Sequence, residues 1–213
     1  MQRRVLLPAG GQIKPKPRAE RLAQTRAALI AAARRAFGEK GYAEASMDDF
    51  TAQAGLTRGA LYHHFGDKKG LLMAVILQID SEMAARLNAI SAAAPDRWQG
   101  FIDENVGYIE MALEPEIQRI VLRDGPAVLG DPSQWPNNDG CVAAISASVQ
   151  RLKSEGLIRA VDAEAAARLI CGASTYAAQW IANAQDPAAT AKRAIPAFRA
   201  LMEGLLRGAE APV

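Results

Sequence analysis

The chain has two histidines, His63 and His64, and they stand side by side in the segment AGLTRGALYHHFGDKKGLL, residues 54–72. An imidazole pair can bind a metal ion or act in acid–base catalysis. Consecutive helical residues point about 100° apart, so the two rings cannot readily share one metal. No HxxxH, HExxH or cysteine partner lies near, and a catalytic pair would have to form on an exposed basic helix. The segment therefore favours contact with a large anion.

The two cysteines could also do chemistry. Cys141 and Cys171 lie far apart in alanine-rich segments and show no CxxC spacing. The pattern indicates neither a zinc site nor a disulfide framework, and we expect buried free thiols. No metal and no cofactor is expected.

Composition favours a folded chain whose two parts have different partners. With 213 residues and 50% hydrophobic content, the chain can bury a core as one domain or as two. Residues 1–70 hold 13 Lys and Arg against 6 Asp and Glu, a net charge of +7, whereas residues 71–213 hold 12 against 17, a net charge of −5. Such asymmetry is typical of a basic part that meets a polyanion and a second part that holds a ligand.

Apolar residues recur at helical spacing along the chain, which predicts an all-α fold. Residues 1–19 read as a flexible basic arm with Arg3, Arg4, Lys14, Lys16 and Arg18. We expect a helix-turn-helix domain over residues 20–67 and a larger helical domain for ligand binding and dimerisation over residues 68–213. The N-terminus has only VLL as an apolar run, so neither a signal peptide nor a spanning helix is predicted.

Local signals inside residues 20–67 predict two short helices joined by a turn. Ser46 in SMDD is a candidate N-cap whose capping box includes Asp49, and Thr57 is a candidate N-cap for the next helix. Asp67 is expected to cap a long helix to about residue 93. In this unit the turn glycine would let the helices approach closely, held together by Phe50, Ala54, Leu56 and Leu61.

The second short helix is predicted to lie in the major groove of DNA. Leu61 points inward, which leaves Arg58, Ala60, Tyr62 and His63 facing out. Arg58 can hydrogen-bond guanine O6 and N7, Ala60 can touch a thymine methyl, and Tyr62 can reach a phosphate. Gly59 either permits a close phosphate or is simply tolerated in the first turn.

Residues 25–76, TRAALIAAARRAFGEKGYAEASMDDFTAQAGLTRGALYHHFGDKKGLLMAVI, resemble the DNA-binding domain of the TetR family of bacterial one-component repressors. The resemblance implies phosphate contacts from Thr25, Ser46, Tyr62, His64 and Lys68, and base-facing positions at Arg58, Ala60 and His63. Thr57 and Gly59 complete the expected DNA-binding set. Packing near the helix end for His64, and a solvated side chain for Arg58 or Lys68, are the structural alternatives.

Looser resemblance over residues 119–130 and 155–184 implies a helical ligand-binding domain and a dimer. Two apolar stripes at the C-terminus are expected to form a four-helix interface with a second copy. They are Ala166, Ile170, Ala173, Ala177 and Trp180, followed by Ile195, Phe198, Met202 and Leu205. The alternative is that one stripe covers the core of its own subunit.

Aromatic and methionine side chains of the second part are candidates for an effector pocket. They are Trp98, Phe101, Tyr108, Met111, Ile120, Trp135 and Tyr176.

The sequence is thus identified as that of a dimeric, ligand-responsive transcriptional regulator in the bacterial cytoplasm. We expect a repressor that binds a palindromic double-stranded DNA operator and is released by a largely apolar small-molecule effector, with no membrane partner and no enzymatic activity. Two alternatives stay open: a ligand-independent DNA-binding or architectural protein, and an enzyme with a DNA-targeting head.

Overall fold

The computed structural model describes residues 18–206, and this range confirms the all-α fold, with a single isolated β-bridge between Ile158 and Leu206 and no strand. The expected basic arm lies outside the described residues except for its last two, which begin the first helix. The α-helices are α1 (Arg18–Glu44), α2 (Met47–Ala54), α3 (Arg58–Phe65), α4 (Lys68–Ala93), α5 (Arg97–Glu110), α6 (Gly125–Leu129), α7 (Asn138–Ser154), α8 (Ala163–Asn183) and α9 (Pro187–Glu203). Shorter 3₁₀ turns are η1 (Met111–Leu113) and η3 (Pro132–Gln134), and η2 (Ile117–Asp124) is a π-helix.

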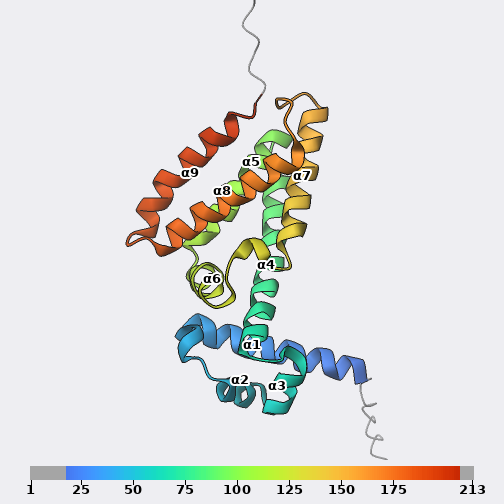
Figure 1. The fold of residues 1–213 in the computed structure, drawn as a ribbon, viewed down its shortest axis with the longest axis vertical. Coiled ribbons are helices and arrows are strands. Elements are labelled where there is room, and N and C mark those ends of the chain that lie inside the picture. The colour runs from blue at the N-terminus through green and yellow to red at the C-terminus, as the bar shows by residue number, and fades with distance from the viewer. Residues whose placement is uncertain (1–17, 207–213) are drawn as a thin grey trace, which may run out of the picture.

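The molecule has two parts joined by α4. Figure 1 shows α1 lying across the base of the molecule, with α2 and α3 on its far side and α4 rising from it into a bundle of α5 to α9. We refer to α1–α3 as the head. Because α4 packs against α1 and α3 at one end and against α5 at the other, a shift of the bundle can reach the head through this helix.

The head is held together by apolar side chains from each of its helices. Phe37 of α1, Phe50 of α2 and Leu61 of α3 are fully buried, and the Phe37 and Phe50 rings meet edge to face with centroids 5.2 Å apart. Ala54 and Leu56 pack against the same core. The residues expected to join the two short helices therefore do so.

Helix caps lie where the sequence predicts them. The side chains of Ser46, Thr57 and Asp67 accept hydrogen bonds from the backbone N–H groups three residues on, at 3.0, 3.3 and 2.8 Å. The expectation for the turn glycine was wrong: a Cβ on Gly55 would meet nothing within 4 Å, and its φ of 64° shows that the requirement is a left-handed backbone. Close approach occurs instead at Gly70, where a Cβ would lie 2.0 Å from the Phe65 carbonyl oxygen.

Two neighbouring segments of the second part have structure that local sequence pattern does not indicate. The segment 124–140, which Gly, Pro and Asn residues mark as a loop, contains α6, with Pro126 in its first turn, where its missing N–H costs nothing. The segment before it is a π-helix, η2, which packs against α1, α4 and α8. No helix between residues 18 and 206 is long and apolar enough to cross a membrane.

Candidate nucleic-acid interface

The outer face of α3 carries the polar residues expected to read DNA. Arg58, Gly59, Tyr62 and His63 are exposed, and the Tyr62 side chain has 54% of its surface open to solvent although it is a large aromatic residue. Ala60 is half-buried between them. Since α3 lies on the side of the head turned away from the bundle (Figure 1), this face is free to enter a groove.

Arg58 is ion-paired within the head, a feature that its sequence position does not reveal. Its Nε and Nη2 both donate to the Asp48 carboxylate of α2, and both side chains are exposed. The hydrogen bonds to Arg58 lower the pKa of Asp48, and those to Asp48 raise the pKa of Arg58. The planar fork that could bind guanine therefore already binds a planar carboxylate in the DNA-free protein.

Lys68 at the start of α4 is held by the end of α1. Its Nζ lies 4.3 Å from the centre of the Tyr42 ring and 3.4 Å from the carbonyl oxygen of Ala43, to which it donates. Burial lowers the pKa of Lys68. These contacts hold the ammonium group against the end of α1, and Lys68 itself begins α4, whose first-turn N–H groups can also receive a phosphate.

The remaining expected DNA contacts border this surface. Ser46 and Thr57 are exposed N-caps, whereas Thr25 on α1 is half-buried, one residue before Arg26, whose guanidinium lies 5.5 Å from the Phe65 ring. The half-buried His64 packs its ring near that of Phe65, so the packing alternative holds for part of its surface. The His63 and His64 rings are 5.5 Å apart, and within residues 18–206 no third His, Cys, Asp or Glu joins them as metal ligands would.

A second exposed surface lies on the last two helices, but it is not the stripe that the sequence suggested. Ile170, Ala177, Phe198 and Met202 are buried in the core of their own subunit, so they are not free to meet a second copy. Of the expected set, Ala166, Ala173, Ile195 and Leu205 are half-buried against that core, and Trp180 is exposed. The large apolar side chains that face solvent on α8 and α9 are Leu169, Tyr176, Trp180 and Leu201. We call these four residues the α8–α9 face.

The expected pocket residues do not gather around one cavity. Met111, Ile120 and Trp135 are buried in the core, the half-buried Tyr108 packs against it, and Tyr176 belongs to the α8–α9 face. Only Phe101, with half-buried Trp98 packed beside it at 6.2 Å between ring centres, lines a hollow.

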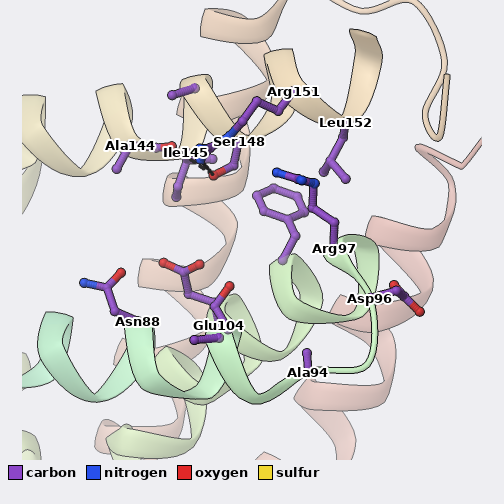
Figure 2. Close-up of a pocket in the computed structure, with 14 residues that line it drawn as sticks. Asn88, Ala94, Asp96, Arg97, Glu104, Ala144, Ile145, Ser148, Arg151 and Leu152 are labelled. Carbon is purple, nitrogen blue, oxygen red and sulfur yellow. Dashed lines mark hydrogen bonds between the residues drawn. The ribbon is translucent and has the colours of Figure 1, made fainter. Parts of the chain in front are cut away.

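That hollow has a volume of about 610 Å³ and lies between α4, α5 and α7. Figure 2 shows Glu104 pointing from α5 toward α7, and Arg97 and Arg151 are also among the lining residues. Burial raises the pKa of Glu104. The lining is thus mixed, because two acids, Asp96 and Glu104, and two guanidinium groups stand beside apolar residues, an arrangement that sequence periodicity could not reveal.

A buried polar cluster lies deeper in the same part. Burial raises the pKa of Asp80 to about 6, and its carboxylate accepts a hydrogen bond from Asn137 Nδ2 at 2.6 Å. The Oδ1 atom of Asn137 and the Nε1 atom of Trp135 are buried without a partner. An unpaired donor and acceptor of this kind cost free energy that a polar ligand or water would recover.

The cysteines differ from expectation in one respect. Both are free thiols, as predicted, but only Cys171 is buried, whereas Cys141 is exposed. Their sulfur atoms lie 3.7 Å apart, although 30 residues separate them in the chain.

A three-helix head that exposes a polar second helix of a helix-turn-helix unit, joined to a separate helical bundle, defines a helix-turn-helix DNA-binding protein. Sequence comparison then gives the family. The family model described as "Bacterial regulatory proteins, tetR family" matches residues 29–75, and that described as "Tetracyclin repressor-like, C-terminal domain" matches residues 98–205. The chain belongs to the TetR family of DNA-binding transcriptional regulators.

Comparison with individual proteins agrees with this family assignment. The chain is 51% identical to a TetR-family transcriptional regulator from Pectobacterium atrosepticum whose crystal structure superposes with a TM-score of 0.82, covering 93% of this chain and 100% of that one. It is 25% identical over 158 residues to the Transposon Tn10 TetC protein of Escherichia coli, covering 72% of this chain and 78% of the relative. It is also 44% identical over 57 residues to the HTH-type transcriptional regulator TtgR of Pseudomonas putida, a match that covers 27% of each chain.

Proposed function

We propose that the protein is a homodimeric repressor that binds a palindromic operator and is released by a small-molecule effector. The exposed polar face of α3 carries this proposal, because Arg58, Tyr62 and His63 have no role in the core of the head. Arg58 and His63 read base edges, while Tyr62, Lys68 and the helix N-termini at Ser46 and Thr57 hold phosphates.

The α8–α9 face forms the dimer interface. Leu169, Tyr176 and Trp180 follow one side of α8, and Arg193 of α9 lies 5.8 Å from the Trp180 ring, so the two helices form one continuous surface. Contiguous exposed apolar side chains on a water-soluble surface mark a protein contact. A twofold axis through this face would place two heads on one side of the DNA and require an inverted repeat.

The effector enters the hollow between α4, α5 and α7. Its acid and guanidinium lining favours a ligand with polar groups at both ends and an apolar centre against Phe101, a more polar molecule than the sequence suggested. Support by analogy comes from a fold relative at 19% identity and a TM-score of 0.63, RolR, whose structure is described as a complex with resorcinol.

Polar contacts connect the dimer helix to the head. The Nε atom of Arg123 in η2 donates to the Ala182 carbonyl oxygen near the end of α8 at 2.7 Å. The next residue, Asp124, accepts from the Tyr42 backbone N–H at 2.8 Å. Arg119 of the same helix donates to the carbonyl oxygens of Gly38 and Glu39. A displacement of α8 therefore reaches the end of α1 through η2.

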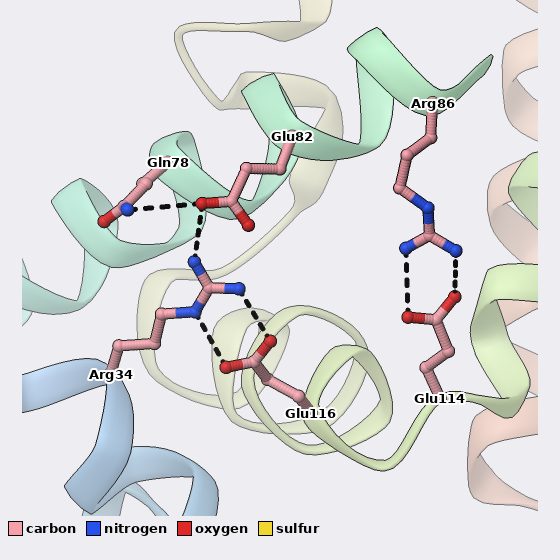
Figure 3. Close-up of polar contacts among 6 residues, drawn as sticks. All are labelled: Arg34, Gln78, Glu82, Arg86, Glu114 and Glu116. Carbon is pink, nitrogen blue, oxygen red and sulfur yellow. Dashed lines mark hydrogen bonds and ion pairs between the residues drawn. The ribbon is translucent and has the colours of Figure 1, made fainter. Parts of the chain in front are cut away.

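Ion pairs form a second connection between the head and the rest of the molecule (Figure 3). Arg34 of α1 donates to Glu116 beside η2 at 2.7 Å and to Glu82 of α4 at the same distance. Arg86 of α4 pairs with Glu114. The half-buried Arg34 thus links three elements, and an effector that prefers one arrangement of them changes the separation of the two heads.

Sequencing the genomic DNA that the purified protein retains tests the proposal. We expect fragments that share an inverted repeat, and a thermal-shift screen of small metabolites followed by operator titration should yield a compound that stabilises the protein and lowers operator affinity. Retained DNA without a common motif would favour an architectural protein. A clear operator whose binding no stabilising compound alters would favour a ligand-independent regulator.

A further inference from the structure

The contact between Cys141 and Cys171 joins two helices, α7 and α8. Cys141 is the fourth residue of α7 and is exposed, whereas Cys171 lies in α8 and is buried. Their sulfur atoms are 3.7 Å apart. A disulfide needs about 2.05 Å between sulfurs, so an approach of less than about 2 Å would bring the pair to bonding distance.

We propose that Cys141 and Cys171 form a peroxide-reactive site that closes into a disulfide within one subunit. The exposed thiol is the one that an oxidant in solution can reach, and the buried thiol lies in contact to resolve the oxidised product. The oxidant class is hydrogen peroxide or an organic hydroperoxide. No motif marks the site, because the cysteines meet only when α7 packs on α8.

The reaction balances in two steps. The Cys141 thiolate attacks the nearer peroxide oxygen and the O–O bond breaks, which forms a sulfenic acid on Cys141. The leaving hydroxide or alkoxide takes up the proton that the Cys141 thiol released and departs as water or an alcohol. The Cys171 sulfur then attacks the Cys141 sulfur, the S–O bond breaks, and the oxygen leaves as water with the Cys171 proton. Two thiols are oxidised and one peroxide is reduced.

The surroundings assign different roles to the two thiols. Contact with the Cys171 thiol lowers the pKa of the Cys141 thiol, whereas contact with Cys141 and burial raise the pKa of Cys171. Asp80 and Glu104 oppose ionisation of Cys141, and Arg168 favours ionisation of Cys171. Because Cys141 is exposed and Cys171 is buried, Cys141 is the thiol that meets the oxidant, and the directions of the two pKa shifts agree with this assignment.

Closure of the disulfide has a consequence that rests on the proposed function. Cys171 lies two residues from Leu169 of the α8–α9 face, on the helix that contacts Arg123. Drawing α7 and α8 together therefore moves the proposed dimer helix. If the reduced dimer matches its operator, any such shift lowers operator affinity.

The chemical step is tested by mass spectrometry on the intact protein after exposure to hydrogen peroxide. Wild type is expected to lose two hydrogen atoms, to yield a Cys141–Cys171 linked peptide, and to recover its mass with dithiothreitol. Cys171→Ala is expected to accumulate a sulfenic acid at Cys141 that dimedone traps, and Cys141→Ser to stay unmodified. Direct conversion of wild-type Cys141 to sulfinic acid, or a disulfide between subunits, would overturn the proposal.

The regulatory consequence is tested on the same samples with operator DNA. We expect oxidised wild type to bind at least about fivefold more weakly, and Cys171→Ala, which cannot form the disulfide, to bind equally before and after oxidation. Failure of the reduced protein to bind any operator contradicts the proposed function, and the mass spectrum alone then decides whether the thiol site exists. Equal affinity of the reduced and disulfide forms contradicts the coupling alone.

Discussion

If Arg58 reads a base as proposed, it has to exchange one partner for another when DNA binds. In the free protein its guanidinium is paired with the exposed carboxylate of Asp48, which would repel DNA phosphates near α3. Guanine offers two acceptors in the same geometry as a carboxylate, so the exchange preserves both hydrogen bonds. We therefore expect Asp48 to orient Arg58 and to reduce affinity for every duplex.

We expect Asp48→Asn to strengthen binding to operator and random DNA alike, because it removes a negative charge next to phosphates and frees Arg58. Fluorescence titration with both duplexes measures this. Unchanged affinity on both would show that Asp48 lies away from the bound DNA.

Replacing Arg58 should change DNA binding in a different way from replacing Lys68. Arg58→Ala is expected to weaken operator binding by about 5- to 150-fold and to relax one base position in each half-site. Lys68→Ala should weaken all duplexes equally and reduce the slope of log affinity against log salt by about 1. The same loss on operator and random DNA for both variants would refute base reading by Arg58.

The raised pKa of the buried Asp80 makes the stability of the protein depend on pH. Its pKa is about 6 in the folded protein against 3.8 in a free side chain, so the folded state holds the proton more tightly. Its contribution to stability therefore falls as pH rises from about 4 to about 6 and then stays low, a loss of about 3 kcal/mol at most.

Asp80→Asn keeps an acceptor for Asn137 and cannot ionise, so we expect it to unfold at a higher temperature than wild type at pH 7.5 and not at pH 4. The exposed Asp139, in the first turn of α7, is the control. Asp139→Asn should not stabilise at either pH. A lower melting temperature for Asp80→Asn at pH 7.5 would show that the ionised carboxylate is needed.

The sequence predicted the helix caps but not the partners of the site residues, and the reason is physical. Ser46, Thr57 and Asp67 act within three residues of their own position, so local pattern places them correctly. The partners of Arg58, Lys68 and Cys141 come from other elements. Only the packed fold brings such groups together, and no local spacing signals them.

Among the elements, α8 has two apolar sides. One side, with Ile170, Ala177 and Ile181, is buried in the subunit, and the other carries Leu169, Tyr176 and Trp180. Periodicity finds an apolar stripe but cannot say which stripe faces its own core, so the expected interface mixed the two sides. Periodicity also cannot reveal the π-helix η2, which packs against α1 and α8.

A charge at Tyr176 tests the α8–α9 face. Tyr176 is 71% exposed, so Tyr176→Glu should leave the subunit folded but place two carboxylates against each other across a twofold axis. Light scattering should show monomers, and operator affinity should fall more than affinity for random DNA. The exposed Gln150→Glu on α7 adds the same charge elsewhere and should stay dimeric. A dimeric Tyr176→Glu with full operator affinity would place the interface elsewhere.

At the scale of the molecule, the proposed function depends on the distance between two heads that each read one half-site. Half-sites about one helical turn apart, or a multiple of it, follow from twofold symmetry. Each head alone offers few contacts, and the dimer gains affinity by binding the second half-site from the same complex.

The most direct test compares the affinity of the wild-type protein for its intact operator, for a single half-site and for a scrambled duplex at one salt concentration. We predict that the intact operator binds at least about 1,000-fold more tightly than the scrambled duplex and at least about 100-fold more tightly than the half-site. Equal affinity for the intact operator and the half-site, or for the operator and the scrambled duplex, would contradict a dimeric repressor that reads DNA with α3.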